Sequence, residues 1–364
     1  MKTQTLRSTA AALCVLTGLL LSACGGDADD STPTTADQAD PDTTDDAAGD
    51  TSVPAAETTS PPETTSVPET TSPPETTSPP ETTSDAVFPM TIDNCGTEVV
   101  LESRPERIVT GGATPLNLLA SLGAGDLIVG RTGEFGQPIE PAYAVEAGDA
   151  PILVPDRPSA EVVIGAGADL LYSEPPGLDA LRPLLDDAGM QTLSTCSTTT
   201  FDQLFSSLTL LGTIVGAADE AAGVIDDLQA RLAAVETSQL GAGRSTVIVS
   251  VFQNRLFVDG NRTLKHSMLD ILGLRNVFEN EDQSTFEVNV EDLIAASPDI
   301  IVLAYGTDNE SFDDAKQILA AAPGASEMTA VQNDAIIGIT FSQAYGSPPA
   351  IDGLEGLADG LASL

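Results

Sequence analysis

The chain has 364 residues and a formal net charge of −41, because 55 acidic residues stand against 14 basic ones. A chain this acidic is not expected to bind nucleic acid or to adsorb on anionic lipid. The acidity fits adaptation to a saline habitat better than it fits any property of a ligand. The single histidine, His266, excludes zinc or manganese held by a cluster of imidazoles.

The first 24 residues have the pattern of an export signal. Lys2 and Arg7 give a basic start, and the apolar run behind them is too short to span a membrane unaided. The run ends in "LSAC", which resembles a bacterial lipobox and implies cleavage before Cys24 and a lipid on its sulfur. The alternative is an ordinary secretory signal in which this cysteine stands by chance. We expect the lipid, because Cys24 lies where the apolar run stops.

Residues 25–85 lack the composition of a folded domain. They carry 15 acidic residues and no basic or aromatic one, and "PPETTS" or "VPETTS" occurs four times from Pro61 to Ser84. Such a segment buries too little apolar surface to offset its chain entropy, so it is expected to be disordered. Repeated prolines and like charges keep it extended, at about 3 Å per residue. We predict a stalk that holds a domain away from a membrane.

Residues 86–198 predict a first α/β lobe. "TEVVL" alternates as in a hairpin strand, and buried strands are expected at "RIVT", "DLIVGRT", "DLLYS" and "QTLST". Helices are expected at "TPLNLLASLGA", "PSAEVVIGAGA" and "GLDALRPLLDDAGM". Strands that alternate with helices of this length form parallel βαβ units.

The alternation stops over residues 199–240. This stretch has helical periodicity and no proline, and Gly212 and Gly216 are possible interruptions. We predict a helical connector made of two helices, the second of them long.

Residues 241–364 predict a second α/β lobe. Strands are expected at "STVIVSVF", "LFVDG", "DIIVLAYG" and "AIIGIT". Helices are expected at "TLKHSMLDILGL", "NVEDLIAA" and "FDDAKQILAA", with "PAIDGLEGLADGLASL" as a closing helix. The fold class is therefore α/β, with two lobes on either side of a helical connector.

A helix–strand unit occurs twice. "SAEVVIGAGADLLYS" (159–173) and "NVEDLIAASPDIIVL" (289–303) align without a gap at an offset of 130 residues. Glu161 aligns with Glu291 in the first turn of each helix, where the helix dipole favours an anion by about 0.3–1 kcal/mol. The apolar positions that follow, Val163 with Ile164 and Leu293 with Ile294, are expected to face inward.

Two cysteines remain after export and lipidation. Cys14 leaves with the signal, which leaves Cys95 and Cys196 in a compartment where disulfides persist. We predict that they pair with each other, and the alternative is two unrelated buried thiols.

No catalytic motif is apparent. His266 lies on a predicted helix and is expected to be structural, no G-x-S-x-G turn precedes a helix, and "GGATPLN" lacks the spacing that cradles phosphates. None of the carboxylates has the loop pattern of a calcium site. We therefore expect a binding protein without a cofactor and without metal held directly by its side chains.

The candidate ligand-binding residues follow the predicted strands, because ligands of open α/β sheets bind beyond the carboxyl ends of the strands. A guanidinium group at such a place suits an anionic chelate or a carboxylate, and the alternative is ordinary pairing with Asp or Glu. The candidates are Thr114, Arg131, Phe135, Tyr172, Asn254, Arg255, Arg262, Tyr305, Phe341 and Tyr345.

With these motifs in order, the chain resembles the solute-binding lipoproteins of ABC importers for ferric siderophores, cobalamin and haem. The resemblance rests on "RPERIVTGGATPLNLLASLGAGDLIVGRTG", on the two copies of the repeat and on "IDDLQARLAAVE", and it covers nearly all of 86–364. It implies two Rossmann-like lobes with central parallel sheets, joined by a long rigid helix, with a ligand cleft between them. It also implies that Glu161 and Glu291 each dock on an arginine of the permease dimer.

The expected protein is a monomer, anchored by Cys24 on the outer face of the cytoplasmic membrane, that delivers a ferric siderophore or related iron chelate to an ABC permease. The alternatives are the same fold with cobalamin or haem, a surface receptor without transport, and an extracytoplasmic enzyme. The absence of tryptophan and the few tyrosines are unusual for a site that stacks on aromatic ligands.

Overall fold

The computed structural model describes residues 86–132, 143, 150–155, 157–175, 178–236, 240–252, 255–306 and 311–364. The predicted signal, the stalk and Cys24 lie outside these residues. Among the helices in the described ranges, none is both long and apolar enough to cross a membrane.

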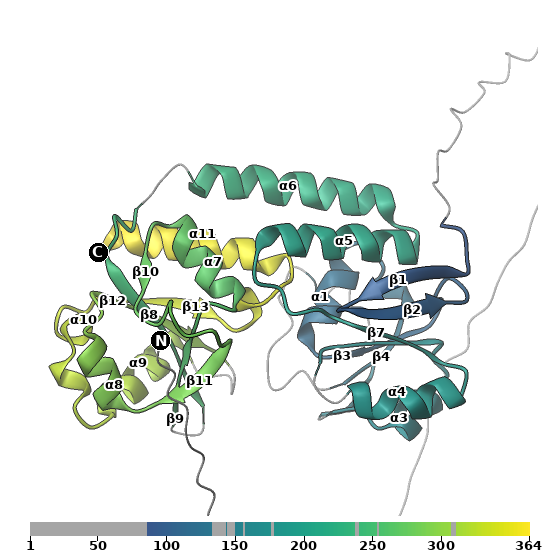
Figure 1. The fold of residues 1–364 in the computed structure, drawn as a ribbon, viewed down its shortest axis with the longest axis horizontal. Helices are drawn as coiled ribbons and strands as arrows, with labels where there is room; N and C mark the ends of the chain where they lie inside the picture. Colours follow the sequence, from purple (N-terminus) through teal and green to yellow (C-terminus); the bar gives the residue numbers. More distant parts are fainter. Residues whose placement is uncertain are drawn as a thin grey trace, which may run out of the picture. The chain divides into compact units, whose positions relative to one another are not determined.

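The first lobe contains a hairpin and a parallel sheet (Figure 1). The hairpin pairs β1 (Met90–Asn94) with β2 (Thr97–Leu101). The sheet has the order β5-β4-β3-β6-β7, and every pair in it is parallel. Its strands are β3 (Ile108–Gly111), β4 (Ile128–Thr132), β5 (Ile152–Val154), β6 (Leu170–Ser173) and β7 (Gln191–Ser194), with helices α1 (Ala113–Ser121), α3 (Ala160–Gly165) and α4 (Leu178–Asp187) and the 3-10 turn η1 (Gly125–Leu127).

Two helices connect the lobes, α5 (Phe201–Val215) and α6 (Ala218–Glu236), which confirms the prediction of two helices with the second one longer. Gly216 ends α5 in the left-handed conformation, at φ 71°. Gly212 lies inside α5, where a Cβ atom would be only 2.6 Å from that of Ala221 on α6. One glycine therefore separates the helices and the other lets them pack closely.

The second lobe has a mixed sheet of order β11-β9-β8-β12-β13, with β10 added beside β8. The pairs of β12 with β8 and with β13 are parallel, whereas β9 pairs antiparallel with both β8 and β11. Its strands are β8 (Ser245–Phe252), β9 (Arg255–Asp259), β10 (Arg275–Asn276), β11 (Thr285–Val288), β12 (Ile300–Tyr305) and β13 (Ile336–Thr340). Its helices are α7 (Leu264–Ile271), α8 (Val290–Ala296), α9 (Phe312–Ala321), α10 (Thr329–Gln332) and α11 (Pro349–Ser363), with turns η2 (Ala325–Glu327) and η3 (Ser342–Ala344).

Both faces of each sheet are buried, and alternate strand residues serve different cores. Ile108 and Ile248 face a large core that continues into α1, α5, α7 and α11. Val109 faces a smaller core with α3 and α4, and Val247 faces one with α8 and α9. Burying each such side chain stabilises the fold by about 1.5–3 kcal/mol, so this two-sided burial explains the nearly continuous apolar strands.

The repeated unit occupies equivalent places in the two lobes. Its strands, β6 and β12, each lie second from a sheet edge. β6 pairs in parallel with β3, and β12 pairs in parallel with β8. The repeated aspartate makes the same kind of hydrogen bond in both lobes. Asp169 accepts from the backbone N–H of Arg107, at 3.1 Å, just before β3, and Asp299 accepts from that of Ser245, at 2.8 Å, where β8 begins.

The repeated apolar positions agree only in part. Val163 and Leu293 are fully buried, as expected. Ile294 packs partly buried against the core of the second lobe, whereas Ile164 is 42% exposed, so its expected inward orientation is wrong. The helix of the first copy, α3, has six residues, and Ile164 lies on its solvent-exposed side.

Candidate functional site

A pocket of about 370 Å³ lies between the two lobes. The first lobe contributes segments that follow β3, β6 and β7, at the carboxyl ends of these parallel strands. The second lobe contributes the start of α7, the start of β11 and the segment after β13. The lining residues are Thr114, Glu174, Pro175, Thr195, Cys196, Ser197, Thr198, Arg262, Thr263, Leu264, Lys265, Ser284, Thr285, Ala344, Tyr345 and Gly346.

The lining is hydroxylic, and it offers hydrogen bonds rather than stacking surfaces. Serine and threonine are the commonest residues in it, and Tyr345 is the one aromatic ring among the described lining residues. Its charged groups come from both lobes: Glu174 from the first, Arg262 and Lys265 from the second. Such a lining can bind the oxygen and nitrogen atoms of a polar ligand.

Glu174 places a carboxylate at the amino end of α1. Its Oε1 atom accepts from the backbone N–H of Thr114 at 3.1 Å. A Cβ atom on Gly112, the N-cap at φ 107°, would come within 2.6 Å of the carboxylate carbon, so this approach requires glycine. Burial raises the pKa of Glu174, although hydrogen bonds from Thr114 act in the opposite direction.

Lys265 forms an almost completely buried ion pair in the second lobe. Its Nζ atom lies 2.7 Å from Oδ2 of Asp259, and the two side chains are 5% and 1% exposed. Oδ1 of Asp259 also accepts from the hydroxyl of Thr285, at 2.6 Å. Burial alone would lower the pKa of Lys265, but the carboxylate of Asp259 outweighs it and raises this pKa. The ammonium group also lies 5.4 Å from the centroid of the Tyr345 ring.

The lobes touch directly at one wall of the pocket. Gly346, in the segment after β13, packs so closely on the side chain of Thr198 that a Cβ atom there would collide with it. Thr198 belongs to the segment between β7 and α5, and its hydroxyl donates to the carbonyl of Cys196 at 3.3 Å. The spacing of the lobes at this wall therefore depends on where the segment 195–198 is held.

Three of the ten candidate ligand-binding residues line this pocket, namely Thr114, Arg262 and Tyr345. Phe135 and Asn254 lie outside the described residues. Phe341 lies next to the pocket, with its ring centroid 6.0 Å from that of Tyr345.

Tyr172 and Tyr305 do not line this pocket, and their side chains pack in the hydrophobic cores. Tyr172 is 4% exposed and packs in the large core, where burial raises the pKa of its hydroxyl. Tyr305 packs in the second lobe, with its ring centroid 5.5 Å from that of Phe312. Strand position could not reveal this, because a side chain at the end of a strand can turn toward a helix instead of the cleft.

Arg255 and Arg131 also point elsewhere. Arg255 pairs with Glu287 across the β9–β11 ladder, and both line a separate groove on the second lobe. This arrangement favours the alternative of surface pairing for Arg255, whose contact with the ligand stays a prediction. Arg131 donates through Nε to the carbonyl of Ala150 at 3.1 Å and does not line this pocket.

Sequence reasoning missed Lys265 and the segment 195–198. The sequence pattern places Lys265 inside a predicted helix. It is one of only three lysines in the chain, and it stands in the first turn, where the helix dipole disfavours a cation. That conflict is a signal that could have drawn attention to it.

Glu161 and Glu291 lie at matching positions, two residues beyond the caps Ser159 and Asn289 of α3 and α8. Both are exposed, and Figure 1 shows α3 and α8 on the same side of their sheets, away from α5, α6 and α11. Hydrogen bonds from its own backbone N–H and from Ser159 lower the pKa of Glu161. Both side chains are therefore accessible to a partner.

Within the described ranges, no group of three or more His, Cys, Asp or Glu side chains is arranged to hold a metal ion. His266 is mostly buried, with its ring 3.4 Å from the amide nitrogen of Asn276 and 3.6 Å from the carboxylate of Asp270. These contacts agree with the structural role expected for it.

Replacing Glu174 with glutamine tests the buried carboxylate. Because the folded pKa is raised, the charged group opposes folding above that pKa, and this cost disappears below the unfolded pKa. Glu174→Gln is therefore expected to be more stable than the wild type at pH 8, with a difference that shrinks to nothing toward pH 4. Urea midpoints across this range measure the difference, and a constant or inverted difference would contradict the expectation.

Two α/β lobes, a helical connector and a polar pocket between the lobes define a solute-binding protein of the two-lobed class. The Periplasmic binding protein family model matches residues 108–342, which is more than half of the chain. The chain therefore belongs to the periplasmic binding protein family.

Known proteins of this kind are similar over most of the chain. The uncharacterized ABC transporter substrate-binding lipoprotein YvrC of Bacillus subtilis is 23% identical over 285 residues, which cover 76% of this chain and 86% of that relative. A cobalamin-binding protein of Halobacterium salinarum is 23% identical over 227 residues, or 61% of this chain and 60% of the relative. The crystal structure of an ABC-type Fe3+-hydroxamate transport system from Saccharomonospora viridis matches with a TM-score of 0.67 and 29% identity, over 75% of this chain and 99% of that chain.

Proposed function

We propose that the protein is an exported solute-binding lipoprotein that captures a ferric siderophore or a related iron chelate and delivers it to an ABC permease. The observation that carries this proposal is the polar pocket between two lobes in a chain of the periplasmic binding protein family. The similarity to the Fe3+-hydroxamate transport system supports an iron chelate as its ligand.

The pocket suits the ligand's oxygen-rich surface. Arg262 favours anionic oxygens of a chelate, and the serine and threonine hydroxyls can both donate to and accept from it. Glu174 would accept from a donor group such as an amide or hydroxyl of the ligand backbone. Binding needs no bond-making step, so we infer a transport protein rather than an enzyme.

Two further parts of the proposal concern partners. Cys24 would carry a lipid that anchors the protein outside the cytoplasmic membrane, with residues 25–85 as a stalk. Glu161 and Glu291 would pair with arginines of the permease, one from each half of a two-fold dimer. Their equal places in two similar lobes support this pairing, because a two-fold partner needs two equivalent contacts.

A thermal-shift panel tests the ligand. The purified exported chain is mixed with ferrioxamine B, haem or cyanocobalamin. A ligand at 100 times its dissociation constant stabilises the folded state by about 2.7 kcal/mol, and we expect such a shift with the ferric siderophore. A shift with haem or cobalamin alone would select that alternative, and no shift with any of them would remove the support for a chelate.

A receptor without transport is the second candidate, because the same pocket would serve it. The two candidates differ in the permease contact, so uptake by cells that carry charge-reversed variants separates them.

A further inference from the structure

The β1–β2 hairpin meets the pocket through its turn. Cys95 and Gly96 form this turn, and both have left-handed backbones, at φ 61° and 81°. Asp93 accepts through Oδ1 from the backbone N–H of Gly96 at 2.6 Å, which completes the turn. Glycine, asparagine and aspartate are favoured at both central positions of such turns. Turn formation therefore does not explain the cysteine at position 95.

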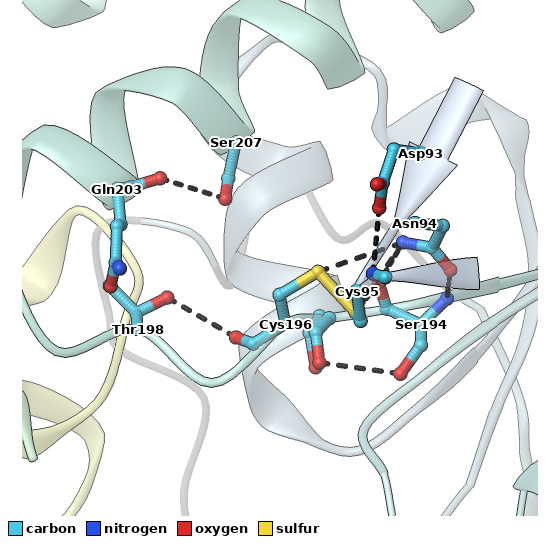
Figure 2. The surroundings of a disulfide bond; sticks show 10 residues. Asp93, Asn94, Cys95, Ser194, Cys196, Thr198, Gln203 and Ser207 are labelled. Carbon is cyan, nitrogen blue, oxygen red and sulfur yellow. Dashed lines mark hydrogen bonds between the residues drawn. A yellow bond between two sulfur atoms is a disulfide. The ribbon is translucent and has the colours of Figure 1, made fainter. Parts of the chain in front are cut away.

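The disulfide explains the cysteine. Cys95 is bonded to Cys196, which lies 101 positions later in the sequence, and their Cα atoms are 5.2 Å apart. Cys196 lines the pocket, as do its neighbours Thr195, Ser197 and Thr198. The bridge thus joins the hairpin turn to the middle of one pocket wall (Figure 2).

Asn94 adds a second attachment beside the bridge. It is 4% exposed, its Nδ2 donates to the carbonyl of Ser194 at 2.8 Å, and its Oδ1 accepts from the Ser194 N–H at 2.8 Å (Figure 2). The Asn94 amide thus bonds to both backbone groups of one residue of β7, as a neighbouring strand would at this sheet edge. The side chain and the disulfide therefore hold the same short stretch of backbone.

A third attachment lies at the opposite end of β7. The side chain of Gln191 accepts from the N–H of Glu102 at 2.7 Å and donates to the carbonyl of Ser103 at 3.5 Å. This amide also ties the hairpin to β7, but at the amino end of the strand, away from the pocket. It provides a natural control for the attachment at the pocket end.

We propose that the hairpin is a clip whose disulfide and Asn94 amide position the pocket wall 195–198, so that both affinity for the solute and lobe spacing depend on the oxidised bridge. In the described part of the chain, one backbone–backbone hydrogen bond joins residues 195–198 to a strand. It runs from the Thr195 N–H to the Ser173 carbonyl, at 3.0 Å. Thr198 also contacts Gly346 of the other lobe. Asn94, Cys95 and Cys196 are positioning residues in this proposal.

The alternative is that the bridge only stabilises the fold. In that case β7 on one side and the cap of α5 on the other would hold the wall without the bridge. Thr200 caps α5 by accepting from the N–H of Gln203 at 3.3 Å, so the far end of the segment is indeed anchored. A local measurement at the wall separates the two cases from a global loss of stability.

Hydrogen exchange of the purified exported chain tests the clip without a ligand. The double variant Cys95→Ser with Cys196→Ser and the single variant Asn94→Ala are expected to exchange at least threefold faster over residues 195–198. Residues 300–305 of β12, which are buried in the second lobe, should be unchanged. Gln191→Ala is the matched control and should leave the exchange of 195–198 at the wild-type rate.

Binding of ferrioxamine B supplies the functional readout, and this part rests on the proposed function. The Cys and Asn94 variants are expected to bind it at least fivefold more weakly, whereas Gln191→Ala should bind like the wild type. Two results would overturn the clip. One is a wild-type exchange rate at 195–198 in the Cys variant, and the other is an equal increase of the exchange rate at 195–198 and in β12. If the wild type does not bind ferrioxamine B, the chelate proposal loses support while the exchange comparison still decides the clip.

Discussion

Glu161→Arg combined with Glu291→Arg is expected to abolish uptake while solute binding stays intact. Both glutamates are exposed at the starts of α3 and α8, and neither lines the pocket. Reversing both charges would place cations against the permease arginines that we propose as their partners, and like charges in contact repel strongly. Uptake of radioactive iron from ferrioxamine B by cells that carry each variant is the measurement, and we expect at least a tenfold loss.

A matched control separates docking from helix stability. Asp202 and Asp313 are exposed acids at the same second helical position, in α5 and α9. Asp202→Arg with Asp313→Arg loses the same helix-dipole interaction, about 0.3–1 kcal/mol per helix, without touching α3 or α8. Uptake should survive this double reversal. Normal uptake in the Glu161 and Glu291 variant would show that docking does not use these residues.

Lys265→Met is expected to destabilise the fold by about 3–5 kcal/mol, because it leaves the carboxylate of Asp259 buried without its partner charge. The bond from Thr285 to the other oxygen of Asp259 remains but does not neutralise the carboxylate. The midpoint of urea unfolding measures the effect.

The second lobe offers a control with the same donor and the same distance. Lys316 also lies 2.7 Å from a carboxylate, that of Asp334, but these side chains are 27% and 78% exposed. Lys316→Met should cost no more than about 1 kcal/mol, because solvent screens an exposed pair. Equal losses for the two lysines would contradict the view that burial decides their energies. The double variant Lys265→Met with Asp259→Leu should recover much of the loss, because it removes the unpaired charge.

The expected strands and helices follow from local chemistry. β3, β6, β8 and β12 are short apolar runs that end at turn residues, and caps such as Ser159 and Asn289 mark where α3 and α8 begin. The short strands β10 and β11 and the turn-like helix α10 were not anticipated. β11 reads "TFEV", and it is fixed by antiparallel pairing with β9 rather than by a pattern of its own.

The amino-acid sequence by itself determined the two α/β lobes, the helical connector and the repeated unit, because hydrophobic periodicity and capping act over a few neighbouring residues. It also determined the pairing of the two exported cysteines as the simplest expectation, and the structure contains that bond. The shared role of the repeated aspartate, in contrast, depends on backbone groups that lie 62 and 54 positions away in the sequence.

Only the tertiary structure decided which polar side chains share a pocket. Arg255 and Arg262 both follow strand-like segments and both lie near an acidic partner, yet Arg255 lines a groove on the second lobe, whereas Arg262 lines the pocket between the lobes. Tyr172 and Tyr345 differ likewise, one in the core and one at the pocket. Such outcomes depend on contacts between residues far apart in the sequence, such as Thr198 with Gly346, and on the packing that turns each side chain inward or outward. A local pattern encodes neither.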